Sequence, residues 1–263
     1  MLGAIYGDIV GSVYEFNNIK TKDFELFTKD SSFTDDSVLT LAVAKALCEL
    51  EDRNDMEAFK NLLIGAFHEL SEVYFDAGYG YRFFRWILSR STEPYGSYGN
   101  GSAMRVSPVA WYASSLEECI DFAKASAEVT HNHPEGIKGA VVTAGATYLA
   151  RTGAEMEDIK AFVAKYYQID FTLDEIRPTY KFNETCQGSV PQAMEAFFES
   201  TSFEDTIRNA ISIGGDSDTL AAIAGAVAEA YYGMSLEQAS KAKERLPEPL
   251  LEIHKAFCEK IMK

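Results

Sequence analysis

Basic residues are scarce in this 263-residue chain, which has 24 Lys and Arg against 40 Asp and Glu and a formal net charge of −16. Sequence-independent binding of nucleic acid depends on Lys and Arg that neutralise phosphates, so we expect no stable nucleic-acid binding. Attraction to an anionic membrane surface is disfavoured for the same reason. A small anion can still bind where helix N-termini, backbone amides or bound cations supply the positive field.

Cysteine is also scarce, and the four cysteines lie far apart with no CxxC pair. This excludes a zinc ribbon and a disulfide framework, and it indicates reduced thiols in the core. The N-terminal segment carries Asp8 and Glu15 inside its apolar stretch and has no basic region, so it is not typical of a signal peptide. No run approaches the roughly 18 uncharged apolar residues of a membrane span. The sequence therefore predicts a cytoplasmic protein without a membrane partner.

Strand-like alternation is equally rare, and helical periodicity dominates the chain. Apolar residues repeat at three- and four-residue spacing over 39–50 and again over 220–231, where Gly233 is placed to end the helix. Further helices are predicted over residues 2–14, 55–72, 80–90, 116–128, 135–151, 156–166, 190–199, 203–212 and 248–262. The expected fold is all-α, a compact bundle of about a dozen helices.

Three long loops are predicted, over residues 16–34, 91–108 and 168–189. Loops longer than about 12–15 residues in a compact domain are often functional. None of the three has the length or composition of an interdomain linker. We therefore expect one domain over residues 1–263, acting as a monomer.

Two acidic segments each open a predicted helix: Thr-Asp-Asp at 34–36 and Gly-Gly-Asp-Ser-Asp-Thr at 214–219. Taken singly, the first is explained by helix capping and by the preference of carboxylates for a helix N-terminus. Capping explains only part of the second, because one carboxylate suffices for a cap and two flank the serine there. If the two helix starts meet in the fold, four carboxylates converge, and like charges 4 Å apart repel by about 4 kcal/mol at an effective dielectric near 20. Oxygen ligands without His or Cys favour Mg²⁺, Mn²⁺ or Ca²⁺ as the compensating charge.

The N-terminal helix carries a stripe of glycines at Gly3, Gly7 and Gly11. Each interior glycine costs about 1 kcal/mol relative to alanine, which is worthwhile where another helix must pack very closely. Asp8 and Glu15 lie two helical turns apart and share a face, which fits either a solvated acidic stripe or a functional one.

Two polar segments complete the candidate site. The glycine-rich stretch 95–105 enters a helix, so its consecutive backbone amides can hold a phosphate, and Tyr95 and Tyr98 can stack on a base. The segment Thr-His-Asn-His-Pro at 130–134 has no accompanying Cys or third His. We therefore expect His131 to contact a polar ligand or cap a helix rather than bind zinc.

Taken together and in this order, these segments resemble the ADP-ribosylglycohydrolase family. The matching stretches are GDIVGSVYE (7–15), TDD (34–36), GYGYRFFRW (78–86), YGNGSAMRVSP (98–108), THNHPEGIKGA (130–140) and GGDSDT (214–219). Ser37 and Ser217 stand where many members have Thr, and both keep a hydroxyl. Residues 168–189 match nothing in the family pattern.

The resemblance implies an all-α fold with a dinuclear Mg²⁺ or Mn²⁺ site in a cleft. The implied metal ligands are Thr34, Asp35, Asp36, Asp216, Asp218 and Thr219. The implied contacts to ADP-ribose are Asp8, Tyr98, Gly99, Asn100, Gly101, Ser102 and His131. Glu15, just beyond the glycine helix, is our first choice for the catalytic acid and base, and Asp36 and Asp216 are the alternatives.

The implied reaction is hydrolysis of the glycosidic bond between ADP-ribose and a modified acceptor, either a protein or another ADP-ribose derivative. Arginine is the expected acceptor, through an N-glycosidic bond, and O-linked serine is the alternative. Two other classes of function stay open: a module that binds ADP-ribose without cleaving it, and a Mg²⁺-dependent phosphohydrolase that releases AMP.

Overall fold

The computed structural model describes residues 1–262, and its regular structure is helical. The helices are α1 (Leu2–Gly11), α2 (Asp35–Glu49), α3 (Met56–Val73), α4 (Tyr81–Leu88), α5 (Gly101–Met104), α6 (Ser107–Tyr112), α7 (Leu116–Glu128), α8 (Pro134–Arg151), α9 (Met156–Val163), α10 (Leu173–Ile176), α11 (Cys186–Phe198), α12 (Phe203–Ser212), α13 (Ser217–Tyr232), α14 (Leu236–Lys243) and α15 (Glu248–Ile261). Within residues 1–262 there is no strand, and a single antiparallel bridge joins Gly99 to Thr185. The predicted all-α fold is confirmed.

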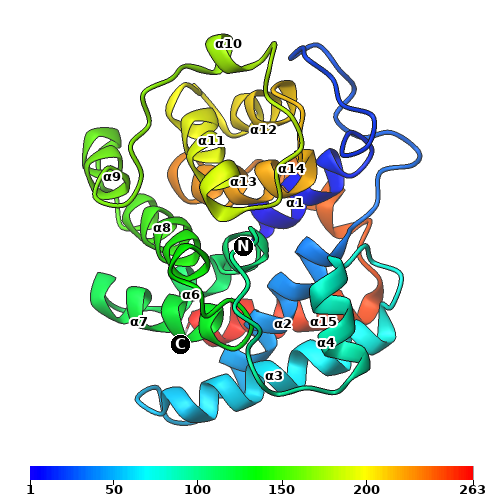
Figure 1. Cartoon of the computed structure of the whole chain (residues 1–263), viewed down its shortest axis with the longest axis vertical. Coiled ribbons are helices and arrows are strands. Elements are labelled where there is room, and N and C mark those ends of the chain that lie inside the picture. Colours follow the sequence, from blue (N-terminus) through cyan, green and yellow to red (C-terminus); the bar gives the residue numbers. More distant parts are fainter. Residues whose placement is uncertain (263) are drawn as a thin grey trace.

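Helix α13 is the centre of the molecule, with α1 beside it, α11 and α12 on one side and α2 and α3 on the other (Figure 1). Every residue of α13 from Ser217 to Ala228 is buried, and so is the whole of α1. The alanine-rich sequence of α13 permits this, because small side chains let neighbouring helices approach closely from several directions.

The closest approach is between α1 and α13, which run antiparallel. The α-carbon of Gly7 lies against the backbone of Ala221, so that an added β-carbon would fall 2.1 Å from the Ala221 carbonyl oxygen. The β-carbon of an alanine at Gly11 would lie 2.4 Å from the Asp218 α-carbon. Only glycine fits at these positions, which confirms that the glycine stripe serves close helix packing.

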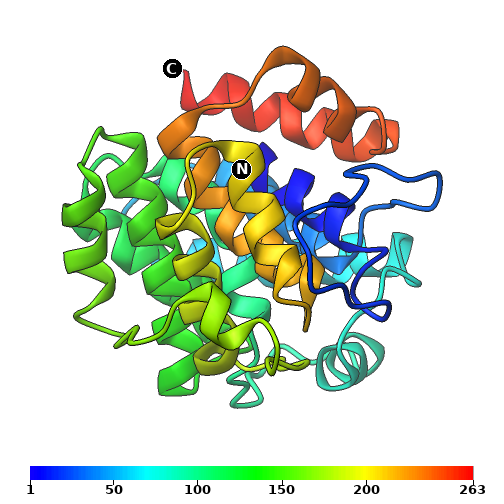
Figure 2. The same cartoon turned by 90° about the horizontal axis from the view of Figure 1, so that it is seen from above.

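One continuous apolar core draws buried side chains from every helix, from α1 to α15. The C-terminal helix α15 runs along one side of the molecule and packs on α2 (Figure 2). The chain thus forms one compact domain. Among the residues that the structure describes, no helix combines the length and apolarity needed to cross a bilayer.

Several elements differ from the prediction. Helix α1 ends at Gly11 and α9 at Val163, each three residues earlier than predicted, and the predicted loop 168–189 contains the short helix α10. Helix α11 begins at Cys186 rather than at 190, because Thr185 caps it by accepting a hydrogen bond from the Gly188 amide and the helix tolerates Pro191 in its second turn. The predicted loop 91–108 contains the single turn α5 and the start of α6. Helix α14 was missed, although a capping box between Ser235 and Gln238 marks its start.

Candidate metal centre and substrate cleft

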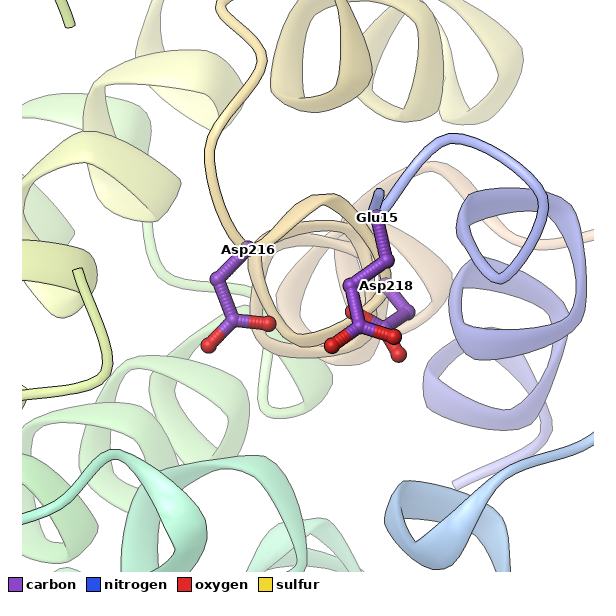
Figure 3. Close-up of side chains that lie close together, drawn as sticks. All are labelled: Glu15, Asp216 and Asp218. Carbon is purple, nitrogen blue, oxygen red and sulfur yellow. The ribbon is translucent and has the colours of Figure 1, made fainter. Parts of the chain in front are cut away.

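The N-termini of α2 and α13 meet, as the acidic segments require for a shared site. The Thr219 hydroxyl donates a hydrogen bond of 3.2 Å to Asp36 Oδ2 and so joins the two helix starts. Carboxylate oxygens of Glu15, Asp216 and Asp218 lie within 4.8 Å of one another. In Figure 3, Glu15 descends from the loop after α1, and its carboxylate lies beside that of Asp218.

A backbone turn with left-handed glycines presents the α13 carboxylates to this point. Gly214 and Gly215 have φ of 67° and 82°, a region that side-chain-bearing residues rarely adopt. The Asn18 side chain holds the turn, accepting from the Gly215 amide at 2.7 Å and donating to the Gly215 carbonyl at 2.8 Å. The Lys20 ammonium also donates to the Ile213 carbonyl. The loop after α1 is thereby fastened to the start of α13.

Asp8 lies behind the site rather than in it. Its carboxylate accepts hydrogen bonds from the Thr34 amide at 3.0 Å, the Thr34 hydroxyl at 2.7 Å, the Ser37 amide at 3.1 Å and the Ser37 hydroxyl. It is fully buried and does not line the cleft. The expected contact between Asp8 and substrate is thus not available in this structure, because the carboxylate is committed to tying the start of α2 to α1.

Burial and like charge together raise the free energy of ionising the carboxyls of the acidic cluster. The pKa of Asp36 and of Asp218 lies well above its usual value, because both carboxyls are buried and face neighbouring carboxylates. The pKa of Glu15 is raised to about 7 by burial and then by the charges of Asp216 and Asp8. Burial also raises the pKa of Asp216, although a hydrogen bond from the Asn100 side chain opposes the shift.

The donor set fits hard divalent cations. Asp36 Oδ1 and Asp218 Oδ1 are buried and have no hydrogen-bond partner among residues 1–262. An orphaned, buried carboxylate oxygen is expensive unless a cation satisfies it. The hydrogens of the Thr34 and Thr219 hydroxyls are used on Asp8 and Asp36, which leaves oxygen lone pairs on both threonines. These residues therefore suit Mg²⁺ or Mn²⁺ on chemical grounds.

The acidic cluster lines a cleft of about 450 Å³, a size usual for small-molecule sites. Twelve of the residues predicted for the site line this cleft: Glu15, Thr34, Asp35, Asp36, Tyr98, Gly99, Asn100, Gly101, His131, Asp216, Asp218 and Thr219. Convergence of the two acidic segments, which the sequence only suggested, is thus present in the fold.

The glycine-rich loop lines the cleft and is held by the segment 184–189 and by the acidic cluster. The Asn100 amide donates to the Glu184 carbonyl at 2.8 Å, and the Cys186 amide donates to the Tyr98 carbonyl at 2.9 Å. The Asn100 side chain donates to Asp216 Oδ2 at 2.7 Å and to the Ser189 hydroxyl at 3.1 Å. Both of its donor hydrogens are therefore committed, and Asn100 connects the loop to the acidic cluster.

Ser102 is the second predicted substrate contact that the fold places elsewhere. Its hydroxyl donates to the Gly136 carbonyl at 2.7 Å, and the residue is fully buried outside the cleft lining. It fastens α5 to α8, because a hydroxyl so enclosed needs an internal acceptor.

Several lining residues carried no recognisable functional signal in the sequence. Phe182 comes from the segment 168–189, and its ring stacks on that of Phe16 with centroids 6.4 Å apart. Tyr81, which the sequence showed only as part of the family-like stretch 78–86, also lines the cleft and is 74% exposed. Arg105 was visible only as the end of the glycine-rich motif, yet its side chain is completely buried beside the cleft.

The sequence model of the ADP-ribosylglycohydrolase family matches residues 1–259. The chain belongs to this family. Members of the ADP-ribosylglycohydrolase family are hydrolases, and this chain is therefore a hydrolase enzyme. The resemblance noted in the sequence is confirmed over nearly its whole length.

Curated relatives of this ADP-ribosylglycohydrolase extend over most of the chain. ADP-ribosylhydrolase ARH3 of Gallus gallus is 27% identical, over 99% of this chain and 93% of its own. ARH3 of Homo sapiens is also 27% identical, over 98% and 92%. ADP-ribosylarginine hydrolase Tri1 of Pseudomonas putida (strain GB-1) is 26% identical, over 89% and 70%.

A solved structure has the same fold as this family member. The chain described as "ADP-ribosylglycohydrolase-related protein complex" superposes with a TM-score of 0.65, covering 99% of this chain and 95% of that one. The sequence identity is 21%, so this likeness establishes the fold.

Proposed function

We propose that this enzyme is a Mg²⁺-dependent hydrolase that removes ADP-ribose from arginine side chains of proteins. The observation that carries the proposal is the meeting of two acidic helix starts in a cleft that a glycine-rich loop also lines. Family membership supports cleavage of ADP-ribose derivatives. The name of the Pseudomonas putida relative, ADP-ribosylarginine hydrolase, supports arginine as the acceptor.

Two Mg²⁺ ions, or Mn²⁺, are the proposed cofactors. Their ligands would come from Thr34, Asp35, Asp36, Asp216, Asp218 and Thr219. When bound, the cations supply positive charge that offsets the carboxylates and polarises substrate oxygens. The buried, unpartnered oxygens of Asp36 and Asp218 support this assignment.

The glycine-rich loop and its neighbours would hold the ADP-ribose. Gly99 and Gly101 have no side chains, so the diphosphate can lie directly on the backbone and on His131. Tyr98 is 43% exposed at the mouth of the cleft and is suited to stack on the adenine base.

Glu15 is the proposed catalytic acid and base, with Asp36 and Asp216 as the alternative bases. Water adds its oxygen to the anomeric carbon, C1″, and the bond from C1″ to the guanidine nitrogen breaks. The carboxylate takes the proton from water and returns a proton to the leaving nitrogen, so that atoms and charge balance. The position of Glu15 beside Asp216 and Asp218, half-buried at the cleft, supports this role.

The rim of the cleft favours a guanidinium acceptor over a serine hydroxyl. Phe16 directly follows Glu15, is 82% exposed and stacks on Phe182 at an interplanar angle of 17°. A guanidinium group stacks on aromatic faces and pairs with carboxylates, and Glu15 and Glu184 both line the cleft nearby.

The decisive experiment is mass spectrometry of products from matched peptides ADP-ribosylated on arginine or on serine, each with Mg²⁺ and with EDTA. Intact ADP-ribose released only from the arginine peptide and only with metal supports the proposal. Release from the serine peptide alone reassigns the acceptor, AMP indicates a phosphohydrolase, and tight ADP-ribose binding without any release indicates a binding module.

A pair of variants in the loop after α1 tests the acid–base assignment. Glu15→Gln keeps the side-chain volume and should lower kcat by about 10²- to 10⁴-fold. Glu25→Gln, in the same loop but exposed, is the matched control and should keep full activity. An active Glu15→Gln enzyme would move the role to Asp36 or Asp216.

A further inference from the structure

Arg105 is a buried cation beside the cleft that has no carboxylate partner. Its side chain is 0% exposed, and its guanidinium carbon lies 4.4 Å from the centre of the Phe67 ring. Burial lowers its pKa to about 10, so it keeps its charge at neutral pH. No ion pair within residues 1–262 includes it. Burying an unpaired guanidinium costs folding free energy, so we ask which side chains its hydrogen bonds hold in place.

The Arg105 guanidinium is connected to His131 through one hydroxyl. Arg105 Nη2 donates to the Ser126 carbonyl at 3.0 Å and to Thr130 Oγ1 at 2.8 Å. Thr130 Oγ1 in turn lies 2.8 Å from His131 Nδ1. Arginine can only donate, so Thr130 Oγ1 must be the acceptor in the first of these contacts.

This chain of contacts determines which nitrogen of His131 carries the proton. The Thr130 hydroxyl has one hydrogen of its own, and in the described part of the chain His131 Nδ1 is its one hydrogen-bond acceptor. If Nδ1 carried the proton instead, that hydroxyl hydrogen would be buried without an acceptor, since Thr130 is 0% exposed. The arrangement therefore favours a hydrogen on Nε2.

His131 Nε2 faces the glycine-rich loop at the cleft. It lies 3.3 Å from the point where a β-carbon on Gly101 would stand and 3.6 Å from the equivalent point on Gly99. No hydrogen bond from Nε2 to another residue is formed within 1–262. Burial, followed by the charges of Arg105 and Arg82, holds the pKa of His131 well below its usual value, so the ring is neutral.

We propose that Arg105 is a positioning residue that acts through Thr130 to fix His131 as its neutral Nε2–H tautomer, which donates a hydrogen bond to an anionic group on the glycine-rich loop. The anionic group would be the diphosphate of ADP-ribose, and this part rests on the proposed function. The tautomer itself follows from the hydrogen-bond chain alone. Glycine at positions 99 and 101 leaves the donor uncovered.

Nitrogen-15 NMR of the intact protein tests the tautomer without substrate or activity. Long-range proton–nitrogen correlations distinguish Nε2–H, Nδ1–H and doubly protonated rings, and the chain has only four histidines to assign. The expected result at pH 7 is the Nε2–H pattern for His131. An Nδ1–H pattern or an imidazolium would overturn the inference.

Variants at Thr130 then test the connection to Arg105. Thr130→Val removes the hydroxyl at nearly constant volume and should turn the His131 signal into a tautomer mixture. It should also weaken ADP-ribose binding in calorimetry by the inverse of the fraction of rings that keep the hydrogen on Nε2, about twofold for an equal mixture. Thr130→Ser should restore both properties. Thr143→Val is the matched control, because Thr143 is equally buried and its hydroxyl has no partner in the described residues.

The outcomes separate the two proposals. An unchanged tautomer in Thr130→Val overturns the relay from Arg105, and an unchanged ADP-ribose affinity overturns the donor role. Wild-type protein that fails to bind ADP-ribose overturns the proposed function while the NMR result on the tautomer stands. If Thr130→Val does not fold, the wild-type spectrum still decides the tautomer, and Thr130→Ala, which also lacks the hydroxyl, tests the connection to Arg105.

Discussion

Replacing Gly11 with alanine should damage the candidate metal centre through the packing of α1 on α13, without replacing the side chain of any proposed ligand. The added β-carbon would lie 2.4 Å from the Asp218 α-carbon, 2.6 Å from the Asp218 amide nitrogen and 2.7 Å from the Ser217 carbonyl oxygen. All three are backbone atoms, so no side-chain rotation can relieve the contact. The helices must separate, and Asp218 must move with its backbone.

The size of the effect follows from these distances. Ordinary van der Waals contact begins at 3.4 Å, so the shift needed is 3.4 − 2.4 = 1.0 Å. Overpacking of this kind costs about 1–3 kcal/mol of folding free energy. A displacement of about 1 Å at a catalytic group lowers activity by about 100-fold. We therefore expect a moderate loss of stability and a much larger proportional loss of activity.

The assay compares Gly11→Ala with a glycine variant that has free space. Gly65 lies in α3 with nothing within 4 Å of an added β-carbon, so Gly65→Ala should stabilise the protein by about 0.5–1 kcal/mol. Urea unfolding in EDTA measures the packing cost without metal, and calorimetric titration with Mg²⁺ measures the site. Both variants receive the same activity assay.

Three results would refute the reasoning. The first is a Gly11→Ala protein as stable as wild type in EDTA, since relieving the contact must cost free energy of folding. The second is unchanged Mg²⁺ affinity, which would separate Asp218 from the metal centre. The third is equal destabilisation by Gly65→Ala, which would mean that the loss in Gly11→Ala does not arise from the α1–α13 contact.

Four further predictions concern charge. Asp36→Asn should lower kcat at least about 100-fold, which kinetics measures. It should also stabilise the protein in EDTA, because it removes one of the mutually repelling carboxylates, and urea unfolding measures that gain. Mg²⁺ at about 100 times its Kd should stabilise the fold by about 2.7 kcal/mol in thermal unfolding. In EDTA the folded-state pKa of Glu15, about 7, exceeds the unfolded value, so protonation of Glu15 stabilises the fold. This contribution to the stability is lost as the pH rises through about 7. A slope of stability against pH that is the same with Mg²⁺ and with EDTA would contradict the prediction. Burial lowers the pKa of His254 to about 4, so its contribution of up to about 3 kcal/mol is lost as the pH falls from about 6.5 to about 4, and His254→Gln should flatten that part of the curve.

Local signals were sufficient for the helices and for the ligand types of the site. Apolar periodicity located α2 and α13, and Gly233 ends α13 with φ of 74° as expected of a C-terminal glycine. The segments at Thr34 and Asp216 indicated helix starts with carboxylates in their first turns. The errors lay at boundaries, such as the start of α11 before Pro191, and in short helices such as α14 that were not predicted.

Roles that depend on a partner far along the chain were beyond sequence reasoning. Asp8 and Ser102 were expected to contact substrate, but each is saturated by hydrogen bonds to residues 26 or more positions away. Asn100 was expected to face the ligand, and its side chain instead connects the loop to Asp216. Which polar atoms are already satisfied is decided only when distant segments pack together.

The sequence by itself determined the all-α fold, the family and the inventory of oxygen ligands, because periodicity and residue chemistry are properties of short segments. Only the tertiary structure decided that α2 and α13 meet end to end, that Glu15 completes a three-carboxylate group with Asp216 and Asp218, and that Arg105 reaches His131 through Thr130. The physical reason is that convergence, burial and the direction of a hydrogen bond belong to pairs of residues. Such pairs are brought together by packing, here above all by the glycine contacts of α1 on α13.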